Sequence, residues 1–241
     1  MVRPFAVFDI DGTLIRWQLY HAISDAFVKL GYVKPKAYQI VKDARMEWKR
    51  RSSKGDFRSY EKVLIETYEA MLKDLTHEQF LMAAEAVFDE YKDQVYTYPR
   101  ELINKLKGEK YLLFAISGSQ VEIVEKIAAY YGFDAWVGTV YEYREGRYTG
   151  QKTVGSADKA ATLKMMIKEH GASLEDSIAI GDSQSDIPML EMVQRPITFN
   201  PERGLFKHAS KKGWQIVLER KNMIYELEKR NGQYQLAKTT A

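Results

Sequence analysis

The chain has 241 residues, of which 45% are hydrophobic and 29% are charged, a composition typical of globular proteins. It contains no cysteine, which excludes disulfide bonds, zinc–thiolate sites and cysteine nucleophiles. The formal net charge is only +3, and no apolar run approaches the roughly 18 residues of a membrane span. Asp9 and Asp11 come too early for the apolar segment of a signal peptide. We therefore expect a cytoplasmic protein with no membrane partner.

Three short apolar runs indicate buried strands, at residues 5–8, 111–116 and 177–180. Each run lacks polar alternation and is followed by a helical pattern, which favours an α/β fold with a doubly wound parallel sheet. Ligands of such sheets gather at the carboxyl ends of the strands. The residues at those ends are small or acidic: Asp9-Ile10-Asp11-Gly12-Thr13, Ser117-Gly118-Ser119 and Gly181-Asp182-Ser183.

Helix signals lie between and after these runs. Pro99 begins one helical pattern and Gly108 ends it, and Asp158 is placed to cap another. The chain is therefore predicted to form helices over 99–108, 120–131 and 159–170, and further short strands over 197–199 and 214–218. The last ten residues, 232–241, are polar, and we expect them to be loose.

The 82 residues from Arg16 to Thr97 contain no strand-like run. Apolar residues recur there at helical spacing over 19–30 and 60–71, and Thr76-His77-Glu78-Gln79 is a capping-box pattern before a helix that continues to Tyr91. A parallel-sheet crossover needs only about a dozen residues. We therefore expect residues 16–97 to form a small helical domain inserted into a core of residues 1–15 and 98–241.

Asp9 and Asp11 stand two residues apart where the first strand ends. Two close carboxylates repel each other, and a cation allows both to stay ionised. Oxygen ligands beside a phosphate are a typical setting for magnesium, and a carboxylate can also attack phosphorus to form an aspartyl-phosphate. Solvated turns often contain the same Asp-x-Asp pattern, so this pair alone leaves both interpretations open.

The other two strand ends add to the chemical interpretation. Ser117 and Gly118 offer a hydroxyl and backbone N–H groups before a helix, an arrangement suited to binding phosphate. Asp182 and Asp186 supply two more carboxylates. Taken singly, Asp186 is also suited to cap the following helix, and Lys159 to be an ordinary solvated lysine.

Together these residues resemble the four motifs of the haloacid dehalogenase-like phosphohydrolases. The motifs are Asp9-Ile10-Asp11-Gly12-Thr13-Leu14, Ser117 after a strand, Lys159, and Gly181-Asp182 with Asp186. The resemblance covers a core of about 159 of the 241 residues. It implies a Rossmann-like core, and the helical insert resembles the small cap of the phosphoserine phosphatase-like branch. In that branch the cap supplies substrate specificity.

The resemblance also implies a role for each motif residue. Asp9 would be the nucleophile, Asp11 the general acid and base, and Thr13 would help to orient the pair. Mg²⁺ would be held by the Asp9 carboxylate, the Asp11 backbone carbonyl and Asp182. The remaining implied roles are phosphate binding by Ser117, Gly118 and Lys159, and orientation of a metal water or of Lys159 by Asp186. Lys152 is a second candidate for the lysine role.

Asp11 distinguishes the reactions of this family. Its dehalogenases lack an acid two residues after the nucleophile, because a halide leaves without a proton, so Asp11 favours a phosphatase. We expect hydrolysis of a small phosphorylated metabolite. Phosphotransfer to another alcohol, or a binding module without catalysis, stays open as an alternative. No nucleic-acid-binding motif is visible, and the sequence specifies no oligomeric state.

The insert differs from that of true phosphoserine phosphatases. Where those enzymes carry a glutamate nine residues after the nucleophile, this chain has Gln18, and Leu64 stands near the position of their cap arginine. Phosphoserine is therefore not the expected substrate. Gln18 and Tyr20 are the candidate specificity residues. The insert is also rich in aromatic residues, which we expect to form its own small core, and a basic stretch over 45–54 is expected to be a solvated helix face.

Overall fold

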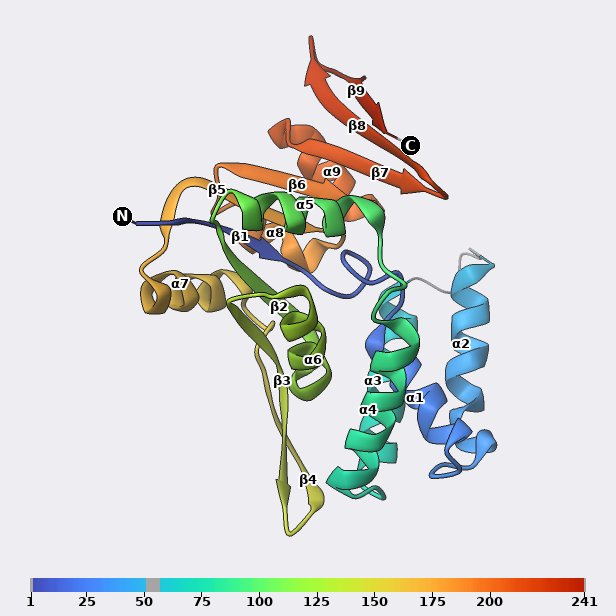
Figure 1. Cartoon of the computed structure of the whole chain (residues 1–241). Coiled ribbons are helices and arrows are strands. Elements are labelled where there is room, and N and C mark those ends of the chain that lie inside the picture. The colour runs from blue at the N-terminus through green and yellow to red at the C-terminus, as the bar shows by residue number, and fades with distance from the viewer. Residues whose placement is uncertain (1, 51–56, 241) are drawn as a thin grey trace. The chain divides into compact units, whose positions relative to one another are not determined.

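The computed structural model describes residues 2–50 and 57–240, and its chain forms two compact units (Figure 1). The first consists of Met1–Arg16, Lys92–Thr139 and Val154–Ala241, and the second of Trp17–Tyr91 and Val140–Thr153. The helical insert expected over 16–97 thus corresponds to the larger part of the second unit. The segment Val140–Thr153, which the sequence analysis assigned to the core, groups with these helices instead.

The described residues form a nine-stranded sheet in the order β4-β3-β2-β1-β5-β6-β7-β8-β9. Its strands are β1 (Pro4–Phe8), β2 (Leu112–Gln120), β3 (Ala135–Arg144), β4 (Arg147–Val154), β5 (Ser173–Gly181), β6 (Arg195–Phe199), β7 (Gln215–Arg220), β8 (Met223–Arg230) and β9 (Gln233–Thr240). All five predicted strands are present, whereas β3, β4, β8 and β9 were not predicted.

The central strands of this sheet are parallel. β1 lies between β2 and β5, and its last residue, Phe8, pairs with Ala115 on one side and with Ile180 on the other. β2 with β3, β5 with β6, and β6 with β7 are also parallel pairs. The carboxyl ends of β1, β2 and β5 therefore meet at one edge, as the apolar runs predicted.

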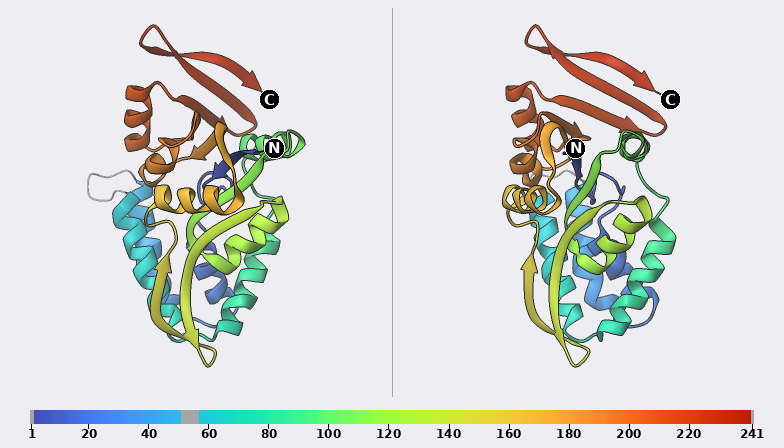
Figure 2. Two further views of the ribbon diagram at one scale, coloured as in Figure 1. Left: turned by 90° about the vertical axis from the view of Figure 1, so that its left-hand side faces the viewer. Right: turned by 60° about the vertical axis from the view of Figure 1, so that its left-hand side comes forward.

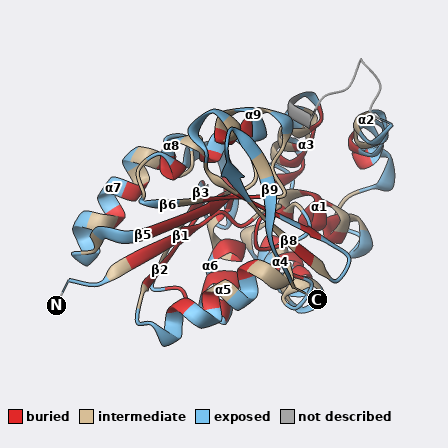
Figure 3. Cartoon of the chain, turned by 90° about the horizontal axis from the view of Figure 1, so that it is seen from above, coloured by how far each residue is buried: buried red, intermediate tan, exposed pale blue. Residues whose placement is uncertain are grey.

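Helices cover both faces of the sheet (Figure 3). One face carries α5 (Thr97–Gly108) and α6 (Val121–Tyr131), and the other carries α7 (Lys159–His170), α8 (Ile187–Leu190) and α9 (Arg203–Lys212). Successive residues of β1 point to opposite faces, so Phe5 and Val7 join the buried cluster that includes Leu163 of α7 and Leu205 of α9. The doubly wound α/β class is thus confirmed.

The helix ends follow the signals in the sequence. The Asp158 carboxylate caps α7 by accepting a hydrogen bond from the Ala161 backbone N–H at 3.0 Å. Gly132 and Gly171, which follow α6 and α7, have φ values of +67° and +58°, the left-handed conformation that commonly ends a helix. α5 begins at Thr97, two residues before Pro99, the predicted first residue.

The expectation that residues 232–241 are loose was wrong. Gln233–Thr240 form β9, which pairs antiparallel with β8 along its whole length (Figure 2). Asn231 and Gly232 between them have φ values of +52° and +80°, as a two-residue hairpin turn with left-handed backbone requires. Most side chains of β9 are exposed, so backbone pairing holds a strand whose polar sequence suggested a loose tail.

The second unit contains α1 (Leu19–Lys29), the 3₁₀ helix η1 (Pro35–Tyr38), α2 (Gln39–Lys49), α3 (Phe57–Leu72) and α4 (His77–Tyr91). The capping box at the start of α4 is confirmed, because the Thr76 and Gln79 side chains each bond the other residue's backbone N–H. Phe27, Tyr60 and Tyr68 are buried, so part of the aromatic set forms the unit's own core, as expected. Arg51 and Lys54 of the basic stretch lie outside the described residues.

The segment Val140–Thr153 completes this unit. It holds the outer part of β3 and most of β4, joined by a turn in which Glu145 and Gly146 have positive φ. The Gly146 carbonyl accepts a hydrogen bond from the His77 backbone N–H at 2.8 Å, and the His77 ring stacks on Tyr143 with a centroid distance of 3.8 Å. The helices of this unit therefore share its core with a β-hairpin.

Candidate active site

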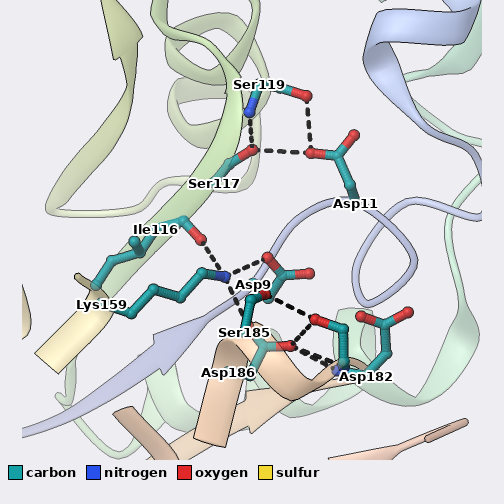
Figure 4. Close-up of polar contacts among 10 residues, drawn as sticks. Asp9, Asp11, Ile116, Ser117, Ser119, Lys159, Asp182, Ser185 and Asp186 are labelled. Carbon is teal, nitrogen blue, oxygen red and sulfur yellow. Dashed lines mark hydrogen bonds and ion pairs between the residues drawn. The ribbon is translucent and has the colours of Figure 1, made fainter. Parts of the chain in front are cut away.

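Asp9 stands directly after β1 and is 6% exposed. Its backbone N–H donates to the Ile180 carbonyl at 3.0 Å, which continues the pairing with β5 and fixes the residue at the strand end. The Lys159 ammonium, from the first residue of α7, donates to Asp9 Oδ1 at 2.7 Å and to the Ile116 carbonyl at 3.2 Å (Figure 4). The first motif, the second strand and the predicted lysine thus meet at one point.

Asp186 is completely buried and holds the loop that follows β5. Its Oδ2 accepts hydrogen bonds from the backbone N–H groups of Asp182 at 3.0 Å and Ser183 at 2.9 Å. Its Oδ1 accepts from the Lys159 ammonium at 2.6 Å. Asp186 therefore closes the turn before α8 and holds Lys159. Its side chain makes no capping hydrogen bond to α8 itself, so the expected helix cap is not formed.

Burial and mutual repulsion control the charges of this cluster. Burial raises the pKa of Asp9 to about 7; Lys159 opposes this rise, and Asp186 and Asp11 add to it. Burial makes the largest contribution to the pKa of Asp182, and the negative charges of Asp9 and Asp186 add to it. Together they raise this pKa well above its usual range. Burial alone would lower the pKa of Lys159, but Asp186 and Asp9 outweigh it and raise the pKa instead. Lys159 thus faces more than one carboxylate, which leaves an excess of negative charge.

A divalent cation fits this excess. Carboxylate oxygens of Asp9, Asp182 and Asp186 lie within 4.8 Å of one another, a spacing that one ion can bridge. Both oxygens of Asp186 already accept hydrogen bonds from Lys159 and from backbone N–H groups. Asp9 and Asp182 are therefore the side chains best placed to bind the ion, and hard oxygen ligands of this kind suit Mg²⁺.

Gly12 keeps the first motif close to Asp182. It has a φ of +84°, and a Cβ atom at this position would stand 2.4 Å from Asp182 Oδ2. A side chain here would displace that carboxylate, and the backbone conformation itself favours glycine. The turn after Asp11 and the loop after β5 can pack this closely only because residue 12 has no side chain.

Asp11 is held by two hydroxyl groups of β2. The hydroxyls of Ser117 and Ser119 donate to Asp11 Oδ2 at 2.8 Å and 2.9 Å, and the Ser119 backbone N–H donates to Ser117 Oγ at 2.9 Å (Figure 4). Ser117 was predicted from the sequence, whereas Ser119 was not. The alternation of side chains along a strand could have identified Ser119, because residues i and i+2 lie on the same face.

Gly118 and Thr13 occupy the remaining positions around this edge. The Gly118 carbonyl accepts a hydrogen bond from the Thr139 hydroxyl at 2.6 Å, which ties β2 to β3. Thr13 is fully buried in the turn after Asp11, where its backbone N–H donates to the Ile10 carbonyl at 3.3 Å. Its hydroxyl oxygen is buried and has no hydrogen-bond partner among the described residues. Both residues lie in the first unit with the other motif residues.

Three predicted candidates lie in the second unit instead. Lys152 forms an ion pair with Glu69 of α3, whereas Lys159 contacts Asp9, so the contacts favour Lys159 for the phosphate-binding lysine. Gln18 precedes α1, and its carbonyl accepts a hydrogen bond from the Ala22 backbone N–H. Tyr20 packs edge-on against Tyr68 at a centroid distance of 4.6 Å, and its hydroxyl lies 3.1 Å from that of Tyr141.

None of the helices within residues 2–50 and 57–240 has the length and apolar character needed to cross a membrane. The polar groups of the candidate site are a buried carboxylate held by a lysine, a second carboxylate held by hydroxyls, and a third that can share a cation with the first.

In comparison with protein families, the family of haloacid dehalogenase-like hydrolases matches residues 6–191. A probable phosphatase of Mycobacterium tuberculosis is 27% identical over 219 residues, which cover 89% of this chain and 75% of that protein. A histidinol-phosphatase of Neisseria meningitidis is 26% identical and is covered over 99% of its length, against 90% of this chain.

Solved structures share the fold. A protein of unknown function from Bordetella pertussis has a TM-score of 0.71 at 23% identity, with 90% of this chain and 98% of that chain covered. A phosphoserine phosphatase determined as a phospho-aspartyl intermediate analogue has a TM-score of 0.61 at 23% identity, with 92% and 95% covered.

Proposed function

This chain belongs to the haloacid dehalogenase-like hydrolases, in their phosphoserine phosphatase-like branch, and from that premise we propose that it is a magnesium-dependent phosphatase. Its proposed substrate is a small phosphorylated metabolite of the cytoplasm, cleaved through an aspartyl-phosphate on Asp9. The observation that carries the proposal is the meeting of Asp9, Lys159 and Asp186 with Asp182 at the carboxyl ends of β1 and β5.

In the proposed reaction a carboxylate oxygen of Asp9 attacks phosphorus, and the bond from phosphorus to the leaving oxygen breaks. Asp11, in its protonated form, gives its proton to that leaving oxygen. A water molecule then attacks the aspartyl-phosphate, Asp11 takes the proton of the water, and the bond between Asp9 and phosphorus breaks. Thr13 would help to orient Asp9 and Asp11 from the turn that directly follows Asp11.

The phosphoryl oxygens would be bound by the Ser117 hydroxyl, the Gly118 backbone N–H and the Lys159 ammonium. Lys159 is already held by Asp9 and Asp186, so its charge is oriented before the substrate binds. Such a preorganised donor costs no reorganisation when negative charge develops on the transferred group.

Mg²⁺ would be held by the Asp9 carboxylate, the Asp11 backbone carbonyl and the Asp182 carboxylate, while Asp186 orients the surrounding groups. When bound, it would offset the repulsion between the nucleophile and the dianionic phosphate. The raised pKa of Asp9 and of Asp182 supports this assignment, because a cation would favour the ionised form of both carboxylates.

The proposed substrate is not phosphoserine. Gln18 takes the place of a glutamate that could bind the amine of that substrate, and the buried Leu64 stands where a cap arginine could bind its carboxylate. We assign substrate specificity to Gln18 and Tyr20. One relative is named a histidinol-phosphatase, and this name agrees with a substrate that is a small phosphomonoester other than phosphoserine.

The direct test is the release of inorganic phosphate from an aryl phosphate, with Mg²⁺ and after its removal by a chelator. We expect activity only with the metal, and we expect intact-mass analysis of rapidly quenched enzyme to find one phosphoryl group on Asp9. The control is Asp9→Asn, which should neither turn over nor become labelled. An active Asp9→Asn variant would contradict the nucleophile, and phosphate transferred to an added alcohol rather than to water would favour a phosphotransferase.

A further inference from the structure

Ser117 has two partners in the structure and a third in the proposed reaction. Its hydroxyl donates to Asp11 Oδ2 at 2.8 Å, and its oxygen accepts a hydrogen bond from the Ser119 backbone N–H at 2.9 Å. The proposed function also requires this hydroxyl to donate to a phosphoryl oxygen. A serine hydroxyl carries one proton and can make one strong donation at a time. When Ser117 binds substrate, it therefore has to release Asp11.

Ser119 can hold Asp11 in its place. Its hydroxyl donates to the same oxygen, Asp11 Oδ2, at 2.9 Å, and Ser119 itself is only 2% exposed. Ser117 and Ser119 lie on the same side of β2, while the Gly118 position between them faces Ser156. The close-up shows both hydroxyls directed at the Asp11 carboxylate (Figure 4).

The backbone of Ser119 is held on both sides. Its N–H is bonded to Ser117 Oγ, and β3 approaches it so closely that a Cβ atom on Gly138 would stand 2.9 Å from the Ser119 carbonyl oxygen. The pairing of β2 with β3 is irregular between Ile116 and Gln120, the stretch that contains both serines. Ser119 is thus a fixed point from which to position Asp11.

We propose that Ser119 is a positioning residue that keeps the Asp11 carboxyl in place for proton transfer while Ser117 binds the phosphoryl group. This inference rests on the proposed function, since it requires Asp11 to be the general acid. Ser119 exchanges no proton with the substrate. The proton that reaches the leaving oxygen comes from Asp11, as the bond from phosphorus to that oxygen breaks and the bond from Asp9 to phosphorus forms.

The leaving group provides a test that a purely structural role would not affect. A nitrophenolate departs without a proton, whereas a methoxyphenolate is more basic and needs one. We therefore compare kcat/KM for a series of para-substituted phenyl phosphates, from nitro to methoxy, in the wild-type enzyme and in Ser119→Ala. The ratio of the kcat/KM values for two substrates does not depend on the fraction of enzyme that is folded.

We expect Ser119→Ala to lower kcat/KM for the methoxy substrate about tenfold, as the loss of one hydrogen bond that positions the Asp11 carboxyl implies. For the nitro substrate we expect a several-fold smaller decrease. Ser119→Thr keeps the hydroxyl and should restore the wild-type ratio. The matched control is Ser177→Ala, which removes another fully buried strand hydroxyl, bonded to the Leu174 carbonyl at 2.6 Å. It should leave the ratio unchanged.

The Asp11→Asn variant distinguishes a failure of the Ser119 proposal from a failure of the proposed function. If this variant shows the strong leaving-group dependence and Ser119→Ala does not, the role of Ser119 is refuted and the proposed function stands. If Asp11→Asn loses activity equally on all substrates, the general acid itself is wrongly assigned. An equal decrease of Ser119→Ala on all substrates, or failure of Ser119→Thr to restore the ratio, also overturns the proposal.

Discussion

The carboxylate of Glu219 on β7 binds the guanidinium of Arg16 at 3.0 Å, although 203 positions separate the two residues in the chain. The same carboxylate accepts hydrogen bonds from the backbone N–H groups of Thr97 and Tyr98 at the start of α5, at 3.0 Å and 2.9 Å. Arg16 in turn donates from Nε to the Val95 carbonyl at 3.0 Å. One buried carboxylate thus fixes the chain both where it leaves the first unit and where it returns.

Removal of this carboxylate should destabilise the first unit strongly. In Glu219→Ala the two backbone N–H groups of α5 and the Arg16 guanidinium lose their acceptor, and we expect the free energy of unfolding to fall by about 3 kcal/mol. The control is Glu228→Ala, which removes the exposed partner of Arg230 and should change it by less than about 0.5 kcal/mol. Urea unfolding measures both, and equal effects would contradict the assignment.

Gly12→Ala should impair catalysis beyond its effect on the backbone. The added methyl group would meet Asp182 Oδ2 at 2.4 Å and displace a proposed metal ligand, so we expect activity to fall at least about tenfold. Gly232→Ala is the matched control, because its φ of +80° resembles the +84° of Gly12 and, apart from its two chain neighbours, no described residue has an atom within 4 Å of its Cβ position. That variant should lose only about 1 kcal/mol of stability. Phosphate release and thermal unfolding distinguish the two effects.

The two candidate lysines should differ sharply. Lys159→Met leaves Asp9 and Asp186 without their shared cation, and we expect phosphatase activity to fall by about two to three orders of magnitude. Lys152→Met breaks a partly exposed pair with Glu69 and should change activity by no more than a few-fold. Steady-state assays at saturating Mg²⁺, with circular dichroism to verify folding, make the comparison. Activity lost in Lys152→Met but kept in Lys159→Met would reverse the assignment.

His21 should make the second unit sensitive to acid. Arg45 can only donate, so His21 Nε2 accepts, and the neutral ring carries its proton on Nδ1, toward the Tyr38 hydroxyl. Burial, and then Arg45, Lys49 and Lys42, lower the pKa of His21 to about 4, while Asp25 lies 3.6 Å from Nε2.

The folded-state pKa of His21 thus lies below the ordinary value of 6.5. The unfolded chain therefore binds a proton more readily, and stability is lost as the pH falls from about 6.5 towards 4. After allowance for solvent screening, we expect a loss of about 1–2 kcal/mol over this range. His21→Gln should flatten this dependence in urea unfolding measured at several pH values. A dependence as steep in the variant as in the wild type would rule out His21 as its source.

Sequence reasoning was most successful where a motif is local and follows an apolar run. Asp9 and Asp182 each come directly after a buried strand, so parallel pairing of β1 and β5 alone brings them to the same edge. Lys159 was harder to choose, since Lys152 has a similar position in the chain. The contact that distinguishes them depends on where α7 packs, which no local pattern contains.

Two of the unpredicted strands, β4 and β9, are mostly polar. β4 and β9 are mainly exposed and carry no apolar run, so their existence depends on backbone pairing rather than on burial. The turn signals were nevertheless present, because Glu145-Gly146 and Asn231-Gly232 both adopt the positive φ values of two-residue hairpins. Ser119 was missed although it alternates with Ser117 along β2, because its partner Asp11 lies 108 positions away in the chain.

The division of β3 and β4 between the two units matters for anyone who wishes to exchange modules of this enzyme. Excision of residues 17–91 alone would leave Val140–Thr153 behind. Tyr141 and Tyr148, now 5% and 8% exposed, would then lose the helices that cover them. A transplantable second unit from this chain is therefore discontinuous: it needs two grafts, four junctions, and a recipient whose own third strand accepts the hairpin in register.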